Sequence, residues 1–333
     1  MSRLFYPIAE KIRRGEPVSV PLAAVLSAAT IVQRAGMWAR LRAKPVRVDA
    51  QVVSFGNITA GGTGKTPAVI ERARAELAAG RRVAVITRGY ASRRTREPAA
   101  VDTAQRQTNL YALLGDEPAL IARKCPGAVI VKCPDRVAAA RTAIEEFGCN
   151  TLILDDGFQH VRLVRDENIC VIDASNPFGN GRLVPRGILR ERPESIQRAT
   201  HILLTHCDKA ADLQHLLSQI NTLNPGAPVR TTRHAPTLLW RVAGGEPIEL
   251  ETLREKAINA ACAIAAPESF FQTLRGLGAN IERELAFPDH ATLPEDVLSA
   301  PGLVVVTEKD AVKLADPPEN VYALSIELQD WPG

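Results

Sequence analysis

The sequence lacks the cysteine spacing of a metal site or of a disulfide framework. Its 333 residues include six cysteines, and no two of them form a C-x-x-C pair. Zinc sites and small disulfide-linked domains both depend on regularly spaced cysteines. Several of these cysteines stand in apolar runs, such as Cys170 within residues 168–172 (N-I-C-V-I). We therefore expect buried, reduced thiols in a cytosolic protein.

Large net charge and nucleic-acid-binding motifs are also missing. The 41 Lys and Arg residues nearly balance 37 Asp and Glu, which gives a formal net charge of +4. No recognition helix, aromatic RNA-binding motif or zinc signature is present, so we expect no nucleic-acid partner. Arginine clusters suit phosphate groups and anionic membrane surfaces instead. Many basic residues lie in the first hundred positions: Arg13, Arg14, Arg34, Arg40, Arg42, Lys44, Arg47, Arg81, Arg82, Arg88, Arg93, Arg94 and Arg96.

The sequence has no hydrophobic run long enough to predict a transmembrane helix. Residues 17–33 carry no charge, but a spanning helix needs about 20 strongly apolar residues, and Pro17 and Pro21 interrupt this stretch. A secretory signal would begin nearer the N-terminus and end in a small-residue cleavage site. A core helix and a helix in the membrane interface remain open. Trp38 and the flanking arginines favour the interface, so we interpret residues 1–45 as a membrane-interface region.

Short apolar strands alternate with helices over residues 46–230. This pattern is typical of a parallel sheet with helices on both faces, which places the chain in the α/β class. We expect strands at 51–55, 82–87, 128–132, 151–154, 169–172 and 201–205, and helices at 65–79, 110–124 and 136–147.

The pattern changes after residue 230. Residues 237–242 and 247–250, joined through Gly244 and Gly245, predict a short antiparallel hairpin. Strands at 257–264 and 303–307 and helices at 268–277 and from Asp310 then predict a smaller α/β unit. We assign residues 231–333 to this unit, with the hairpin as its connector.

A glycine-rich loop between the first expected strand and helix predicts a nucleotide site. Glycines let the backbone N–H groups turn toward phosphate oxygens, the lysine reaches the β- and γ-phosphates, and the final threonine hydroxyl binds Mg²⁺. The strict motif has glycine six residues before the lysine, where this chain has threonine. The expected loop residues are Thr59, Ala60, Gly61, Gly62, Thr63, Gly64, Lys65 and Thr66.

Two adjacent carboxylates, Asp155 and Asp156, follow the apolar strand at 151–154. An acidic residue at this place in phosphate-loop enzymes holds Mg²⁺ directly or through water. A turn or helix cap is the alternative for such a residue, but an Asp pair followed by glycine favours the metal. The two motifs together predict ATP or GTP hydrolysis or transfer, without naming the acceptor.

Eight runs, in one order, resemble the tetraacyldisaccharide 4'-kinases of lipid A biosynthesis. They cover roughly residues 20–325, and their joint occurrence is specific. The runs are 56–67, 87–90 (T-R-G-Y), 115–118 (G-D-E-P), 155–160 (D-D-G-F-Q-H), 178–182 (F-G-N-G-R), 189–191 (L-R-E), 287–290 (F-P-D-H) and 307–310 (T-E-K-D).

The resemblance implies that ATP, with Mg²⁺, phosphorylates the 4'-hydroxyl of a tetraacylated glucosamine disaccharide 1-phosphate. It also implies two α/β domains joined by a two-stranded linker, with nucleotide and acceptor meeting between them. The acceptor is a membrane amphiphile, so the enzyme is expected at the cytoplasmic face of the bacterial inner membrane. There it would be a peripheral monomer, held by its N-terminal segment.

The resemblance also assigns residue roles. A sugar hydroxyl is a poor nucleophile and needs a base, and Asp116 resembles the catalytic aspartate of the family. His290 resembles its partner, and Lys65 completes the catalytic set. By themselves, Asp116 would be interpreted as a helix N-cap and His290 as a surface residue. Glu117 is expected beside the metal. The expected substrate-site residues are Arg88, Tyr90, Gln159, His160, Arg190 and Glu191, and the 307–310 run is expected to shape nucleotide binding.

The chain departs from the family pattern in the smaller unit. Ala291 and Leu293 follow His290 where the family usually has a second histidine and an aromatic residue, and residues 263–267 read A-I-A-A-P instead of a glycine-rich run.

Two other functions compete with the kinase interpretation. A phosphate-loop ligase or kinase acting on a soluble small molecule would leave residues 17–33 unexplained. A nucleotide-switched binding protein would need no base at Asp116.

Overall fold

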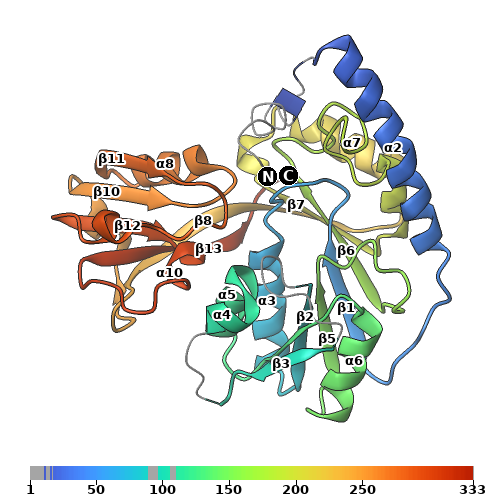
Figure 1. Ribbon diagram of the computed structural model, residues 1–333, viewed down its shortest axis with the longest axis horizontal. Helices are drawn as coiled ribbons and strands as arrows, with labels where there is room; N and C mark the ends of the chain where they lie inside the picture. Colours follow the sequence, from blue (N-terminus) through green and yellow to red (C-terminus); the bar gives the residue numbers. More distant parts are fainter. Residues whose placement is uncertain (1–10, 13–15, 17, 89–96, 106–109, 333) are drawn as a thin grey trace.

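The computed structural model describes residues 11–12, 16, 18–88, 97–105 and 110–332. Figure 1 shows two α/β units, a larger one and a smaller one, connected by two long strands. The described strands form one continuous sheet in the order β11-β10-β12-β13-β8-β7-β6-β1-β5-β2-β4-β3, with β9 paired to β8.

The larger unit has a sheet that is parallel except for its edge strand β3, which pairs antiparallel with β4. Side chains alternate between its two faces: Ile153 packs against α3 and α5, while Leu152 and Leu154 pack on the side of α6. Covering both faces explains why these strands are apolar throughout. The strands are β1 (Gln51–Gly56), β2 (Val83–Thr87), β3 (Ala99–Asp102), β4 (Val129–Lys132), β5 (Thr151–Asp155), β6 (Glu167–Asp173) and β7 (His201–Thr205).

The helices of the larger unit follow the expected positions with two exceptions, one of which is α7 (Leu213–Leu223), where no helix was expected. The helix expected over 110–124 is two helices, because Gly115 adopts a φ of 93°, which glycine tolerates far better than other residues. Asp116 consequently becomes the first residue of a new helix. The helices are α3 (Lys65–Ala78), α4 (Leu110–Leu114), α5 (Asp116–Lys124), α6 (Arg136–Glu145) and α7 (Leu213–Leu223).

The smaller unit also buries both faces of its strands. Val304 and Val306 belong to one apolar cluster, and Val305 belongs to another on the opposite face. Its elements are β10 (Ala257–Cys262), α8 (Pro267–Gly276), β11 (Asn280–Ala286), α9 (Glu295–Leu298), β12 (Leu303–Thr307) and α10 (Glu308–Ala311).

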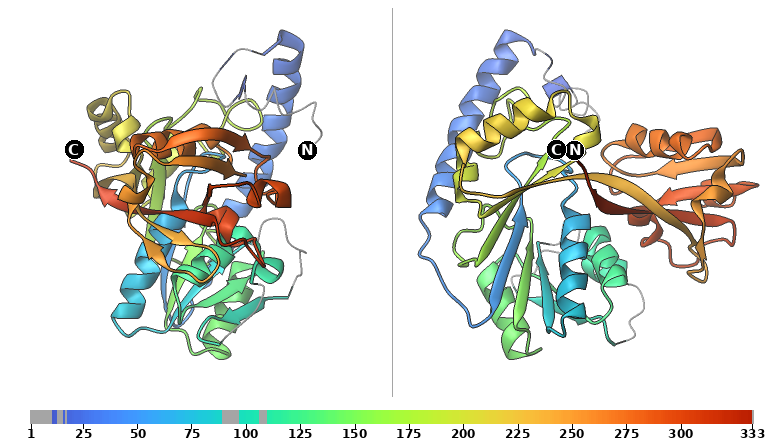
Figure 2. Two further views of the ribbon diagram at one scale, coloured as in Figure 1. Left: turned by 90° about the vertical axis from the view of Figure 1, so that its left-hand side faces the viewer. Right: turned by 180° about the vertical axis from the view of Figure 1, so that it is seen from behind.

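The two-stranded linker implied by the resemblance is present, but its second strand is not the one expected from the hairpin. The hairpin is present, as β8 (Val229–Arg241) and β9 (Pro247–Ile248). However, the strand that accompanies β8 between the units is β13 (Val321–Asp330), which pairs with it antiparallel from Tyr322↔Arg241 to Asp330↔Thr232. The view from behind in Figure 2 shows this pair spanning the two units. The chain thus crosses twice, and its end returns to the larger unit, where the Trp331 amide donates to the Thr231 carbonyl.

Helix α2 (Val20–Leu41) lies along the outside of the larger unit, away from the smaller unit (Figures 1 and 2). None of its described side chains is fully buried. Two polar contacts join it to the body: Arg186 donates to the Ser27 hydroxyl at 3.0 Å, and the Gln33 amide donates to the Arg190 carbonyl at 2.9 Å. A search of the described residues finds no helix with the length and apolar character needed to cross a membrane.

The expectation of buried, reduced cysteines is confirmed. All six cysteines are buried and free. Burial raises the pKa of the Cys170 and Cys262 thiols to about 12, which keeps them protonated and unreactive at neutral pH.

Gly56, at the end of β1, has no room for a side chain. A Cβ there would lie 2.4 Å from the backbone nitrogen of Phe158. We expect Gly56→Ala to lower the free energy of unfolding by about 1–3 kcal/mol through overpacking. Gly226→Ala is the matched control, since a Cβ at Gly226 meets nothing within 4 Å, and it should stay within about 0.5 kcal/mol of the parent. Urea unfolding followed by circular dichroism would measure both, and equal midpoints would contradict the expectation.

Candidate active site

The phosphate loop connects β1 to α3, as expected. Gly61 and Gly64 adopt positive φ angles of 113° and 72°. Thr59, the departure from the strict motif, forms an isolated bridge with Leu189 and is not among the described residues with positive φ. Because its backbone is ordinary, that position does not require glycine.

Neighbouring elements hold the loop from outside. The Thr205 hydroxyl, at the end of β7, donates to the Thr63 carbonyl at 2.9 Å, and the Ala60 amide donates to the Ile188 carbonyl at 2.6 Å. The imidazole of His234 on β8 lies directly against Gly64, where a Cβ would be 2.4 Å from its Nε2. Burial lowers the pKa of His234 to about 3, so this contact is made by a neutral ring.

Lys65 begins α3 and points to the carboxyl end of the sheet. Its Nζ donates to Asn57 Oδ1 at 3.1 Å and lies 3.5 Å from Asp156 Oδ1. Asn57 in turn donates to the Thr59 carbonyl at 2.8 Å, so it supports both the loop and the lysine. The lysine is therefore held at the loop by one hydrogen bond and one ion pair, in the position from which phosphate contacts are made in this motif.

The predicted aspartates lie beside this loop, because β5 and β1 are neighbours with Asp155 opposite Phe55. Burial raises the pKa of Asp155 well above its ordinary value, and the negative charge of Glu117 adds to this effect. Burial acts on Asp156 in the same direction, but Lys65 and Arg190 outweigh it and lower the pKa to about 2. Asp156 is thus an ionised carboxylate held by two cations, whereas a further cation would stabilise the ionised form of Asp155.

These residues fit a nucleotide-bound Mg²⁺. In the described part of the chain no three His, Cys, Asp or Glu side chains are placed to hold a metal ion by themselves. Mg²⁺ at a nucleotide site typically takes one or two protein oxygens and completes its shell with phosphates and waters. The Thr66 hydroxyl and Asp155, which is 4% exposed and influenced by Glu117, supply oxygens of this kind.

Arg190, Gln159 and Glu191 form a buried network around Asp156. Arg190 Nη1 donates to both oxygens of Asp156, at 2.8 and 2.9 Å. Gln159 donates to the Asn57 carbonyl and to Glu191, each at 2.9 Å, and Glu191 also pairs with Arg198 at 2.8 Å. Gln159 and Glu191 are buried, so their contacts support the loop and the carboxylate from behind.

The remaining expected substrate residues are less completely placed. Arg88 follows β2 and His160 follows the Asp pair, and both are half-buried. Tyr90 lies outside the described residues, as does the side chain of Trp38.

Asp116 and His290 meet across the two units. Asp116 opens α5 in the larger unit, and its Oδ2 lies 2.6 Å from Nδ1 of His290 in the smaller unit. Burial alone would raise the pKa of Asp116, but the charge of Lys309 and the hydrogen bond and charge of His290 lower it below its ordinary value. The carboxylate is therefore ionised at neutral pH and able to accept a proton. His290 adopts a φ of 65°, an uncommon conformation for a residue with a side chain.

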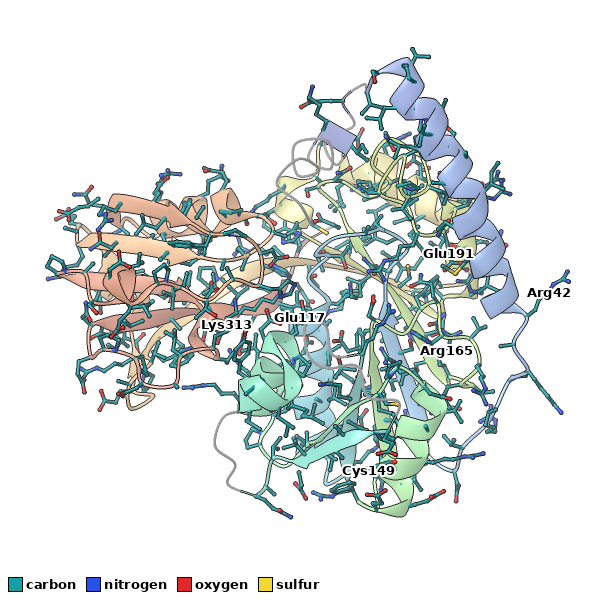
Figure 3. The ribbon with its side chains drawn as sticks, viewed as in Figure 1. Arg42, Glu117, Cys149, Arg165, Glu191 and Lys313 are labelled. Carbon is teal, nitrogen blue, oxygen red and sulfur yellow. The ribbon has the colours of Figure 1, made fainter. Side chains whose placement is uncertain are left out.

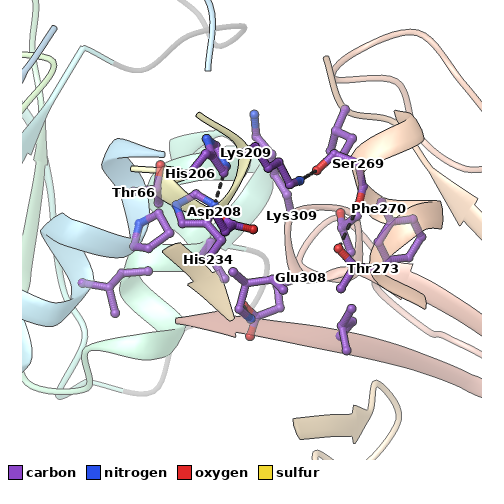
Figure 4. Close-up of a pocket in the computed structure, with 17 residues that line it drawn as sticks. Thr66, His206, Asp208, Lys209, His234, Ser269, Phe270, Thr273, Glu308 and Lys309 are labelled. Carbon is purple, nitrogen blue, oxygen red and sulfur yellow. Dashed lines mark hydrogen bonds between the residues drawn. The ribbon is translucent and has the colours of Figure 1, made fainter. Parts of the chain in front are cut away.

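A cavity of about 240 Å³ lies between the units (Figure 4). Thr66 and Pro67 of α3 line it on one side, and Lys309 lines it on the other. Figure 4 shows Lys209 of the larger unit bonded to Ser269 of the smaller unit, at 3.3 Å. Thr66 thus connects the cavity to the nucleotide loop, and Lys309, whose Nζ lies 3.8 Å from Asp116 Oδ2, connects it to the Asp116–His290 pair.

Several site residues were missed by the sequence analysis. Asn57 stands in the first matching run, directly before the loop, and could have been found there. His234 and Arg198 act through contacts with distant segments, and their sequence neighbours gave no sign of these contacts. Lys309 stands in the 307–310 run, but the sequence did not indicate its contact with α5.

Comparison with known proteins identifies the family. A family model described as tetraacyldisaccharide-1-P 4'-kinase matches residues 17–331. The chain belongs to this family. A tetraacyldisaccharide 4'-kinase of Anaeromyxobacter dehalogenans (strain 2CP-C) is 43% identical over 311 residues, covering 90% of this chain and 81% of that protein. A tetraacyldisaccharide 4'-kinase of Geobacter sulfurreducens is 36% identical, with coverages of 95% and 89%.

A comparison of folds leads to the same family. The crystal structure of LpxK from Aquifex aeolicus, in complex with ATP, matches with a TM-score of 0.69 at 25% identity and covers 98% of this chain and 94% of that one. This member of the tetraacyldisaccharide 4'-kinase family is accordingly an ATP-dependent kinase with a hydroxyl acceptor, in lipid A biosynthesis. These matches argue against the two competing interpretations, a ligase or kinase acting on a soluble small molecule and a nucleotide-switched binding protein.

The departures from the family pattern have structural roles here. Leu293 is 4% exposed and Ala291 packs beside it, so both contribute to the core of the smaller unit. Ala263 is fully buried, and its amide donates to Asp310 Oδ2 at 3.1 Å.

Arg190 provides a test of the network around Asp156. We expect Arg190→Met to lower kcat/KM about tenfold or more, since it removes a two-point charge-assisted contact to that carboxylate. Arg192→Met, which changes an exposed side chain two residues away, is the control and should retain the parent rate. Steady-state kinetics with both substrates would compare them, and equal values for the two variants would show that the contact does not matter.

Proposed function

We propose that this kinase transfers the γ-phosphoryl group of ATP to the 4'-hydroxyl of a tetraacylated glucosamine disaccharide 1-phosphate, with Asp116 as the proton acceptor. The observation that carries the proposal is the 2.6 Å contact between Asp116 and His290. It joins an ionised carboxylate from one unit to an imidazole from the other, and Lys309, 3.8 Å from that carboxylate, lines the same cavity as Thr66 of the phosphate loop. A soluble nucleotide switch has no use for such a pair.

The chemistry of each residue follows from its position. The backbone amides of the loop bind the phosphates, and Lys65 moves from Asp156 to the β- and γ-phosphates when the nucleotide enters. Thr66 and Asp155, with Glu117 nearby, would hold Mg²⁺, which neutralises phosphate charge when bound. Arg190 keeps Asp156 ionised and fixed. These residues bind and orient the triphosphate.

The acceptor step requires a base. The 4'-oxygen forms a bond to the γ-phosphorus, the bond between that phosphorus and the β,γ-bridging oxygen breaks, and ADP leaves. The hydroxyl proton passes to the carboxylate of Asp116. His290 orients this carboxylate and shares the proton through its short hydrogen bond.

The N-terminal helix supports a membrane-surface location. Val20, Val25 and Ile31 are 82%, 65% and 68% exposed, and Ala24 and Ala28 fill the same side of α2. An exposed apolar helix face on an enzyme of a four-chain amphiphile is suited to the acyl region at the membrane interface. We propose that the protein is peripheral at the cytoplasmic face of the inner membrane, and we keep the monomer as a prediction.

The proton acceptor can be tested with Asp116→Asn, which keeps the shape of the side chain. We expect kcat to fall by about 10²–10⁴-fold because the base is lost, while the KM for ATP changes little. The assay follows label from γ-labelled ATP into detergent-dispersed acceptor. Asp49→Asn, an exposed carboxyl, is the control, and Lys65→Ala should abolish transfer. A fully active Asp116→Asn would refute the assignment, and label found only in free phosphate would indicate an ATPase.

The role of α2 can be tested with Val25→Glu combined with Ile31→Glu. Each apolar side chain contributes about 1.5–3 kcal/mol when buried, so the double variant should no longer float with anionic phospholipid vesicles. Leu113→Glu is the matched control, because it alters an exposed apolar residue, 46% exposed, outside α2. Unchanged flotation of the double variant would exclude this face as the membrane contact.

A further inference from the structure

The 307–310 run, expected to shape nucleotide binding, forms a contact with the helix that carries Asp116. Glu308 and Lys309 are consecutive residues of α10, directly after β12. Lys309 Nζ lies 3.0 Å from Glu117 Oε1 and 3.8 Å from Asp116 Oδ2. Glu308 Oε1 lies 2.5 Å from Lys124 Nζ. We call these contacts the α5–α10 interface, and Figure 3 shows Glu117 on the side of the larger unit that faces the smaller one.

The two helices have complementary charges. Helix α5 has Asp116 and Glu117 in its first turn and Arg123 and Lys124 in its last turn. Lys309 of α10 meets the acidic end, and Glu308 of α10 meets the basic end. Reversing or shifting either helix would bring like charges together, so the pairing fixes the register of the interface. It also holds the unit that carries His290 against the helix that carries Asp116.

These pairs are sheltered from solvent. The side chains of Lys124 and Glu308 are 13% and 8% exposed, and those of Lys309 and Asp116 are 20% and 4% exposed. Partly buried ion pairs are screened less by salt than surface pairs. Burial lowers the pKa of Lys309, but Glu117 and Asp116 outweigh it and raise the pKa above its ordinary value. Lys309 therefore remains a cation at neutral pH.

The same short segment supports His290 from behind. Asp310 accepts hydrogen bonds from the Thr307 hydroxyl and from the Ala263 amide, at 2.6 and 3.1 Å. Lys313, which is 1% exposed, donates to Asp310 and to the carbonyl of Ala291, each at 2.9 Å. The His290 amide completes the connection by donating to the Ala263 carbonyl at 3.2 Å.

We propose that Lys309 is a positioning residue for phosphoryl transfer. Its ammonium group reaches across from the smaller unit and holds the carboxylate of Asp116 against His290. Its positive charge offsets the negative charge of that carboxylate. The inference rests on the proposed role of Asp116 as proton acceptor. Lys309 also lines the cavity that Thr66 reaches, so its charge lies at the edge of the space for substrates.

Charged groups approach Asp116 from three elements. His290, with Asp289 beside it, approaches from the loop after β11, Glu117 follows Asp116 on α5, and Lys309 approaches from α10. The Lys309 ammonium lies 3.8 Å from Asp116 Oδ2 and 3.0 Å from Glu117 Oε1. Removing it would leave the adjacent carboxylates of Asp116 and Glu117 without this cation, so Asp116 would be held less firmly against His290.

The test compares kcat and KM for Lys309→Met, Lys309→Arg and Lys124→Met. We expect Lys309→Met to lower kcat about tenfold or more, as for loss of a charge-assisted contact of about 1.4 kcal/mol, with the KM for ATP within about twofold. Arginine should restore most of the parent kcat. Lys124→Met breaks the other ion pair of the same interface but leaves the neighbours of Asp116 in place, so it should lose clearly less kcat than Lys309→Met.

Two results would overturn the inference. One is a parent-like kcat for Lys309→Met, and the other is an equal loss of kcat for Lys124→Met, which would indicate general loosening of the interface. Lys309→Gln carries the same expectations if circular dichroism finds Lys309→Met unfolded. Asp116→Asn, assayed in parallel, separates the two proposals. If Asp116→Asn is fully active, Asp116 is not the proton acceptor. If Asp116→Asn is inactive while Lys309→Met is normal, only the role of Lys309 is refuted.

Discussion

The hydrogen bond between Asp116 and His290 depends on a chain that crosses twice between its two units. His290 belongs to a unit reached through β8, and β13 brings the chain back and pairs with β8 along most of its length. A single flexible connector would leave the orientation of the smaller unit free, at a cost in entropy each time the pair formed. Two hydrogen-bonded strands limit that freedom, and the ion pairs of the α5–α10 interface then select the arrangement in which the carboxylate and the imidazole meet.

The features that could be predicted from sequence are those specified within one segment. The phosphate loop is a strand, a glycine-rich turn and a helix in continuous sequence, and the Asp pair ends a strand whose apolar character is plain. Their adjacency follows from the parallel sheet alone. The resemblance implied a two-stranded connection, but its second strand could not be identified from local sequence, because nothing within β13 indicates that it pairs with β8, a strand some eighty residues earlier. The break at Gly115 was missed for a similar reason, since a helical pattern continues on both sides of it.

The same distinction applies to the site residues. Gln159 and Glu191 were assigned to the substrate site because they stand in matching runs, and a run cannot distinguish a side chain that contacts substrate from one that supports the loop. In the structure both are buried, and their partners are the Asn57 carbonyl, Arg198 and each other. Their identities are constrained by the hydrogen bonds that a buried amide and a buried carboxylate need, since each would be costly if unpaired.

Helix α2 also contacts a residue that supports the site. This helix faces outward with an apolar surface, yet Gln33 donates to the carbonyl of Arg190, whose side chain holds Asp156. Arg190 therefore connects α2, which we propose meets the acyl chains, to a carboxylate beside the phosphate loop. An amphiphilic acceptor has to keep its chains in the interface while its sugar reaches the nucleotide. A helix fastened to the framework of the site by short polar contacts provides a fixed distance between the two, which a flexible N-terminal tether would not.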